Sequence, residues 1–251
     1  MTFNPDYYNP KTIADIVFPC QRSSDLIHDI VCGIRPFPLS GKNGILLYGV
    51  PGTGKSALAT LLPDAIEAGK SGQPADQLFV RVQQGANGAD IGSQIRGRSL
   101  TVPLSGDNHY FVLDEVDNLT KHAMLSLKSA MNIPNTIFVF TTNYFSKIEM
   151  GVVSRCHRVE FNAAPAQAWL PLFKRVLTDL GSVVPHNNLI LPIIAACNGC
   201  ARDIVDAAFD LSIKQKRLVR SPGSSVQTSA QPISQGTVAQ ILTGQKVDVN
   251  P

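Results

Sequence analysis

Long apolar runs, an even set of cysteines and an excess of one charge are all missing from this sequence. No apolar stretch approaches the roughly 20 residues that span a bilayer, and the opening MTFNPDYYNP resembles neither a signal peptide nor a transit peptide. The five cysteines are scattered and odd in number, which argues against a disulfide scaffold. A net charge of +3 is too near balance to demand a nucleic-acid partner. We therefore expect a cytoplasmic or nucleoid-associated protein that does not use a membrane.

What the 251 residues do contain is a regular alternation of short apolar runs and helical patterns. Short apolar runs separated by helices are typical of a buried parallel sheet with right-handed crossovers. The runs cover residues 44–50, 78–82, 109–117, 135–143 and 157–161. From Ala166 onward the apolar residues recur at helical spacing instead. We expect an α/β domain over 1–162, a small all-helical domain over 163–219, and a flexible tail over 220–251 that is rich in Ser, Gln, Pro and Gly.

The strongest motif is GVPGTGKS, residues 49–56, which follows an apolar run and precedes a helical pattern. It matches G-x-x-x-x-G-K-[ST] in the strand–loop–helix context that phosphate binding requires, so a chance match in a glycine-rich turn is disfavoured. Its glycines let backbone N–H groups curve around an anion, and the helix N-terminus adds positive potential. We expect Lys55 to reach the β- and γ-phosphates and Ser56 to bind Mg²⁺. The residues predicted to hold the nucleotide here are Gly49, Pro51, Gly52, Thr53, Gly54, Lys55 and Ser56.

Two further strand ends carry polar side chains. In YFVLDEVD (110–117), an apolar run ends in Asp114 and Glu115, at the strand end where α/β sheets place their sites. We expect Asp114 to hold Mg²⁺ and Glu115 to orient and deprotonate the attacking water. Asn143, after the run FVFTT, is our choice for a contact with the γ-phosphate or its water; a cap of the next turn is the alternative. The glutamate beside Asp114 favours hydrolysis over nucleotide storage.

These motifs, followed by Arg155 and Arg202, occur in the order and rough spacing of AAA+ ATPases. Stretches such as DEVDNLTKHAMLSLKSAM and TNYFSKIEMGVVSRCHRVEF resemble the clamp-loader small subunits, the replication factor C family with its archaeal and phage relatives, over about residues 7–218. The triplet Ser-Arg-Cys at 154–156 is the most specific element of the likeness. The resemblance implies an AAA+ P-loop parallel sheet flanked by helices, followed by a helical lid, with ATP and Mg²⁺ as cofactors.

The resemblance also implies roles for single residues. Arg155 would be the arginine finger that reaches the nucleotide of a neighbouring subunit, the alternative being a solvated surface arginine. Arg202, in GCARDIV, would contact the γ-phosphate of its own subunit from the lid, the alternative being an exposed first-turn arginine. Tyr8 and Pro10, in YYNPK, would lie beside the adenine, although Asn9 stands where the family usually has arginine.

Two segments leave alternatives open. Residues 83–99 align loosely with the part of clamp loaders that presents helix N-termini to duplex DNA, and a solvated loop or hairpin is an equally supported interpretation. The candidates for DNA phosphate contacts are Gln94, Arg96 and Arg98. The single C-x-x-C at 197–200 lacks the second pair that a structural zinc site needs, so no zinc site is predicted.

The expected function is an ATP-hydrolysing switch of clamp-loader type that acts as a homo- or hetero-oligomer on DNA, a sliding clamp or another replication protein. Clamp-loader subunits carry a helical collar after the lid, and the segment 220–251 is too short for one. A phage or mobile-element ATPase with a different client therefore stays open. A polypeptide-threading machine is disfavoured because GANGADIGS offers no aromatic pore residue. A nucleotide-binding adaptor is disfavoured because the hydrolytic residues are intact.

Overall fold

The computed structural model describes residues 5–84 and 89–220, which belong to two compact units. The α/β unit comprises residues 9–162, and the helical unit combines the residues up to Tyr8 with those from Ala163 onward. Sequence pattern alone assigns the short helix η1 (Pro5–Tyr8) to the α/β domain, but the Tyr8 ring packs 6.2 Å from that of Phe209 in the helical unit. Most of the expected tail, from residue 221, lies outside the described residues.

The α/β unit is built on a five-stranded sheet in which all neighbouring strands are parallel, in the order β2-β3-β4-β1-β5. The central strands β3 and β4 are buried at every position, which is why their sequences are almost continuously apolar. The predicted parallel sheet is confirmed, although each of the five apolar runs extends one to three residues past its strand into the segment that follows. The strands are β1 (Gly44–Tyr48), β2 (Asp76–Arg81), β3 (His109–Asp114), β4 (Thr136–Thr142) and β5 (Cys156–Glu160).

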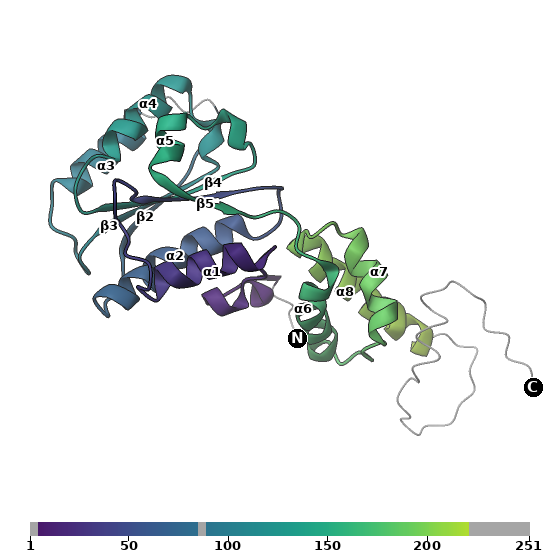
Figure 1. Ribbon diagram of the computed structural model, residues 1–251. Coiled ribbons are helices and arrows are strands. Elements are labelled where there is room, and N and C mark those ends of the chain that lie inside the picture. Colours follow the sequence, from purple (N-terminus) through teal and green to yellow (C-terminus); the bar gives the residue numbers. More distant parts are fainter. Residues whose placement is uncertain (1–4, 85–88, 221–251) are drawn as a thin grey trace, which may run out of the picture. The chain divides into compact units, whose positions relative to one another are not determined.

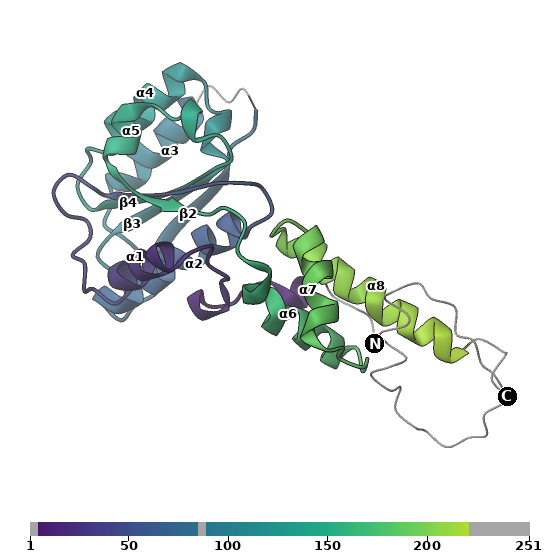
Figure 2. The ribbon, with the colours of Figure 1, turned by 45° about the vertical axis from the view of Figure 1, so that its right-hand side comes forward.

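Helices cover both faces of this sheet (Figure 1). The helices α1 (Gln21–Val31) and α2 (Lys55–Lys70) lie on one face, and the turned view of Figure 2 shows the same separation from the helices of the other face. That second face is covered by α3 (Ala89–Ser99), α4 (Lys121–Ala130) and α5 (Met150–Ser154).

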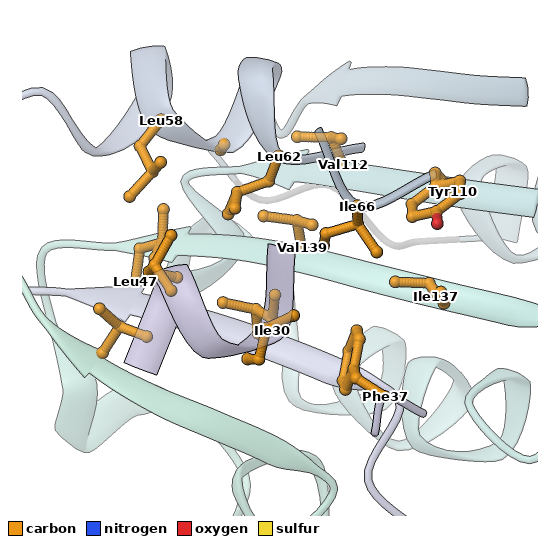
Figure 3. Close-up of a cluster of buried hydrophobic side chains, with 14 of the residues drawn as sticks. Ile30, Phe37, Leu47, Leu58, Leu62, Ile66, Tyr110, Val112, Ile137 and Val139 are labelled. Carbon is orange, nitrogen blue, oxygen red and sulfur yellow. The ribbon is translucent and has the colours of Figure 1, made fainter. Parts of the chain in front are cut away.

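Both faces of the sheet are packed with large apolar side chains. Figure 3 shows Leu58, Leu62 and Ile66, four residues apart on one side of α2, among side chains of the strands. On the other face the ring of Phe138 stacks between those of Phe111 and Phe140, at centroid distances of 5.3 and 5.7 Å. This packing fixes the strands, and with them the loops at the carboxyl ends of the strands.

The helical unit consists of η1 and three longer helices, α6 (Ala166–Asp179), α7 (Asn187–Ala196) and α8 (Ala201–Arg220). Their buried side chains recur at the helical spacing visible in the sequence. They include Trp169, Phe173, Val176, Leu177, Ile190, Ile194, Ile204, Ala208 and Leu211. Across the described ranges of the chain, no helix combines the length and apolarity needed to cross a membrane.

A buried carboxylate fastens α2 to the loop before β3. The Glu67 side chain accepts hydrogen bonds from the Tyr110 hydroxyl (2.7 Å), the Asp107 backbone N–H (2.8 Å) and the Ser71 hydroxyl (2.8 Å). Burial raises the pKa of Glu67, but these hydrogen bonds lower it and prevail, so the net shift is downward. The loop before β3 lies close to this carboxylate: a Cβ added to Gly106, whose φ is +72°, would be 2.6 Å from Glu67 Cδ.

We predict that Glu67→Gln lowers the free energy of unfolding by about 1–3 kcal/mol at neutral pH, because an amide N–H₂ would face groups that are themselves donors. Since the folded-state pKa of Glu67 lies below its ordinary value of 4.5, the stabilisation is complete above that value and is lost as the pH falls through the folded pKa. Urea denaturation should therefore show a gap between variant and parent that is constant at pH values well above 4.5 and narrows as the pH falls below it. Glu160→Gln, at an exposed carboxylate, is the matched control. A gap that persists unchanged in acid would contradict the prediction.

Candidate functional site

The phosphate loop, the acidic motif and Asn143 meet at one edge of the sheet. The strand β4 lies between β1, which leads into residues 49–56, and β3, which ends at Asp114. Asn143 follows β4 directly and so stands between the other two motifs. The sequence-predicted residues of all three motifs therefore share the carboxyl edge of the sheet, the usual place for a ligand in this class of fold.

The loop between β1 and α2 is held open for an anion by its backbone. Gly54 adopts φ 99° and precedes α2, whose N-terminus no side chain caps, so its first N–H groups point into the loop. Gly49 passes so close to the segment after β5 that an added Cβ would overlap the carbonyl oxygen of Phe161. Thr53 is buried and donates its hydroxyl to that same oxygen at 2.9 Å. The loop is thus fastened to the end of β5.

Lys55 lies inside this loop rather than in solvent. Its side chain is buried, and Nζ donates to the carbonyl oxygens of Gly49 (2.9 Å) and Val50 (2.6 Å). Desolvation lowers the pKa of Lys55 to about 8, against the opposing influence of the Asp114 and Asp117 carboxylates. An anion bound in the loop would favour the charged ammonium, so Lys55 is suited to the predicted phosphate contact. Pro51 and Gly52 form the outer turn of the same loop.

Asp114 is the centre of a hydrogen-bond cluster and is fully buried. Its Oδ1 accepts from the hydroxyls of Ser56 (2.6 Å) and Thr141 (2.7 Å), and its Oδ2 pairs with Arg81 Nε at 3.1 Å. The two predicted Mg²⁺ ligands, Ser56 and Asp114, are therefore in contact. Neighbouring ligand oxygens of an octahedral Mg²⁺ lie about 3 Å apart, and the ion prefers oxygen donors, so this pair fits the metal.

Glu115 is held at both its backbone and its side chain. Its backbone adopts φ 60° and ψ 48°, a left-handed conformation uncommon for a residue with a side chain. Its N–H donates to the Thr141 hydroxyl at 2.9 Å, and its carboxylate accepts from Asn118 Nδ2 at 3.1 Å. Asn118 Nδ2 also donates to the carbonyl oxygen of Val82 at 3.0 Å. Thr141 thus joins both acidic residues of the motif.

Sequence reasoning missed the residues that support this site. Thr141 was passed over in favour of Asn143, and Arg81 and Asn118 were not singled out. The available signals were weak: Arg81 is the one charged residue in LFVRV, and Thr141 belongs to the polar end of FVFTTN. The predicted contact of Asn143 with a γ-phosphate stays a prediction.

Arg155 lies at the opposite edge of the sheet. It caps the C-terminus of α5 and immediately precedes β5, whose first residue, Cys156, is level with Gly44 at the start of β1. The phosphate loop begins where β1 ends, five residues further along at about 3.3 Å each, which gives a separation of roughly 15 Å. An arginine side chain does not span that distance, so Arg155 does not reach the phosphate loop of its own chain.

The remaining predicted nucleotide contacts involve the helical unit. Arg202 is exposed in the first turn of α8, and Tyr8 is buried in the same unit, with Arg175 lying over its ring at 5.7 Å. Burial and the nearby Asp179 carboxylate raise the pKa of Tyr8. Pro10 belongs to the α/β unit. The contacts proposed for these residues with a nucleotide stay predictions. Among the residues that the structure describes, no cluster of three or more His, Cys, Asp or Glu side chains could hold a metal ion, and this includes the C-x-x-C segment.

The three candidate DNA residues lie on α3, so the hairpin interpretation is wrong for residues 89–99. Gln94 and Arg96 are exposed. Arg98 is turned toward the sheet, where its guanidinium bonds to Asp76 Oδ1 at 2.6 Å and to the carbonyl oxygen of Gln77 at 3.2 Å. This guanidinium is thus paired with a buried carboxylate, and its contact with DNA stays a prediction.

We predict that Thr141→Val lowers the free energy of unfolding by about 1–3 kcal/mol, because it leaves Asp114 one donor short and the Glu115 N–H without its acceptor. Thr60→Val, at an exposed hydroxyl on α2, is the matched control and should change stability by no more than about 0.5 kcal/mol. Urea denaturation of both variants measures the difference. Equal effects of the two substitutions would contradict the central position of Thr141.

Comparison with known proteins agrees with this geometry. Residues 45–163, which contain the three motifs and Arg155, match the model of the ATPase family associated with various cellular activities (AAA). The chain is 27% identical over 188 residues to replication factor C small subunit 1 of Pyrobaculum islandicum, covering 73% of this chain and 54% of the relative. Replication factor C subunit 5 of Mus musculus is 28% identical over 177 residues, covering 68% and 49%. The chain thus spans about half the length of these curated relatives.

Solved structures bear out the fold. The RuvB Holliday junction branch migration motor of Thermotoga maritima aligns with a TM-score of 0.66 at 15% identity, covering 96% of this chain and 74% of that one. PCH-2 of C. elegans aligns with a TM-score of 0.55 at 14% identity, covering 91% and 69%. The flanked parallel sheet predicted from the motifs is the fold of these proteins. Residues 45–163 are therefore similar to the AAA family of ATPases, within a chain that resembles the clamp-loader small subunits of the replication factor C family.

Proposed function

We propose that this protein hydrolyses ATP as an oligomer, with the triphosphate bound at residues 49–56 of one subunit and Arg155 supplied by the next. The observation that carries the proposal is the position of Arg155 at the amino edge of the sheet, opposite the phosphate loop. Each chain then has a phosphate site at one end of its strands and, at the other end, an arginine that does not reach that site. Two copies placed edge to edge would complete each other.

Within one subunit, different residues bind the phosphates, hold the metal ion and activate the attacking water. The N–H groups of the loop and of the first turn of α2 bind the phosphates, and Lys55 Nζ exchanges its two carbonyl acceptors for phosphate oxygens. Ser56 and Asp114 hold Mg²⁺, which neutralises charge on the phosphates when it is bound. Glu115, with its backbone fixed by Thr141, orients the attacking water and takes its proton. Asn143 lies between these groups, in position to bond the γ-phosphate.

Arg155 of the neighbouring subunit would supply the last charge. A guanidinium neutralises charge that spreads over equatorial phosphate oxygens as the bond to the leaving group breaks. Because the group comes from another copy, turnover becomes conditional on assembly. Arg202 at the start of α8 would contact the γ-phosphate and tie the helical unit to the nucleotide state.

The client that we propose is DNA or a DNA-bound protein, such as a sliding clamp or another replication protein. Support comes from the likeness to replication factor C small subunits and from the exposed Gln94 and Arg96 on α3. Contacts of this type bind the DNA backbone and are sensitive to salt. A related ATPase with another client is the second candidate, because the chain covers only about half of those relatives. Stimulation of turnover by unfolded polypeptide instead of DNA would favour the second candidate.

We predict that Arg155→Ala retains ATP binding and loses turnover by about a thousand-fold, the range typical of an arginine supplied in trans. Glu115→Gln should also bind ATP without hydrolysing it. A mixture of the two variants should regain turnover, because Arg155→Ala subunits keep an intact phosphate site and Glu115→Gln subunits keep an intact arginine. Steady-state phosphate release, measured against total protein concentration, reports all three.

Parent protein diluted below its assembly concentration is the control, and its turnover per subunit should fall. Two outcomes would contradict the proposal that Arg155 acts on the nucleotide of the neighbouring subunit. One is full activity of Arg155→Ala, and the other is a mixture that stays inactive while both variants bind ATP and assemble.

We predict that Arg96→Ala weakens binding to duplex DNA at low salt and reduces the slope of log K against log salt by about 1, as expected for one lost phosphate contact. Fluorescence anisotropy with a non-hydrolysable ATP analogue measures the slope. Arg22→Ala, at an exposed arginine of α1 on the other face of the sheet, is the matched control. An unchanged slope for Arg96→Ala would remove α3 from the DNA surface.

A further inference from the structure

The guanidinium of Arg155 is held by the connection between α4 and β4. Its Nε and Nη2 both donate to Asn132 Oδ1, at 3.2 and 3.1 Å, and its Nη1 donates to the carbonyl oxygen of Gly151 at 2.8 Å. Asn132 itself is exposed, and nothing in the sequence around it, AMNIPNT, marks it as functional. The contact joins residues 23 positions apart.

The support beneath this contact is rigid. Asn43, just before β1, donates its side-chain amide to the carbonyl oxygens of Met131 (2.9 Å) and Thr136 (3.1 Å), which flank Asn132. The backbone N–H groups of Asn43 and Gly44 both donate to the carbonyl oxygen of Arg155, at 3.2 and 3.0 Å. The start of β1 therefore fixes the backbone of Arg155 and the connection that holds its side chain.

The acceptors of the guanidinium are neutral, and two further cations lie near the start of β5. Burial raises the pKa of the Cys156 thiol, and the positive charges of Lys42 and Arg155 oppose that rise. Burial lowers the pKa of His157, and the positive charges of Lys42 and Arg35 lower it further. The ion pairs formed within residues 5–84 and 89–220 do not include Arg35, Lys42 or Arg155. Within the described part of the chain, the charge on Arg155 is thus oriented without forming an ion pair.

We infer that Asn132 is a positioning residue for Arg155: it holds the planar guanidinium in one orientation while leaving its charge for an anion of the adjoining subunit. This inference rests on the proposed function, since it needs the trans role of Arg155. An amide suits the task better than a carboxylate, because a carboxylate at this position would form a charge-assisted pair and compete with the phosphate. It suits the task better than an apolar side chain, because an ordered guanidinium loses less entropy when it binds.

The test is Asn132→Asp, which changes a neutral acceptor into a charged one of the same shape. Turnover (kcat) should fall at least about tenfold, with the Kd for ATP unchanged, because the new ion pair must break before Arg155 reaches the phosphate. Asn132→Ala, which only frees the guanidinium, should lower kcat by about two- to fivefold. Asn135→Asp introduces the same charge in the same connection at an exposed position and should stay within about twofold of the parent.

Mixing separates positioning from a general structural defect. Asn132→Asp subunits keep an intact phosphate site, so turnover should return when they are mixed with Glu115→Gln subunits and should stay low when they are mixed with Arg155→Ala subunits. Thermal unfolding of each variant checks that the fold is kept. Parent-like kcat for Asn132→Asp, in the same assay in which Arg155→Ala is inactive, would overturn the inference and leave the proposed function standing. Parent-like kcat for Arg155→Ala would overturn both.

Discussion

The burial of the Asp114 carboxylate is the constraint on which the candidate site depends. A carboxylate without exposure to water must have its oxygens satisfied by the protein, and here the donors come from α2, β2 and the end of β4. The same hydroxyl of Thr141 that donates to Asp114 accepts the N–H of Glu115, so one threonine sets both acidic residues. The elements that carry the motifs are thereby held in register by the same groups that we propose to bind metal and water. The hydrogen bonds that stabilise this edge of the sheet are therefore also those of the proposed site.

The second constraint is the length of a strand. Because β1 and β5 are parallel and level, the residues just before β5 lie at the opposite edge of the sheet from the residues just after β1. The phosphate site and Arg155 therefore face in different directions by construction, and flexing of a side chain does not remove the separation. In the proposed oligomer, this polarity gives every subunit one face that receives a cation and one that offers it. Subunits of that kind form a head-to-tail ring or filament.

The sequence predicted much of the fold and of the central chemistry, because both leave local traces. Buried parallel strands appear as short apolar runs, and the spacing around Lys55, Ser56 and Asp114 follows from the strand ends they occupy. The rest depends on contacts between distant residues. The pairing of Arg98 with Asp76 joins residues 22 positions apart, and no local pattern announces it. Glu67 stands in an ordinary helical sequence, and two of its donors, Asp107 and Tyr110, come from 40 and 43 residues downstream. Arg81, Thr141 and Asn132 likewise acquire their positions only when the sheet is assembled.

The attachment of the phosphate loop to Phe161 links the movement of the loop to that of the end of β5. Gly49 packs against the carbonyl group of Phe161, and the Thr53 hydroxyl donates a hydrogen bond to it. Phe161 lies one residue before the end of the α/β unit. A displacement of the phosphate loop would therefore also move the end of β5, because this close approach and this hydrogen bond join the two. Because Gly49 has no side chain, the phosphate loop can approach the Phe161 peptide this closely.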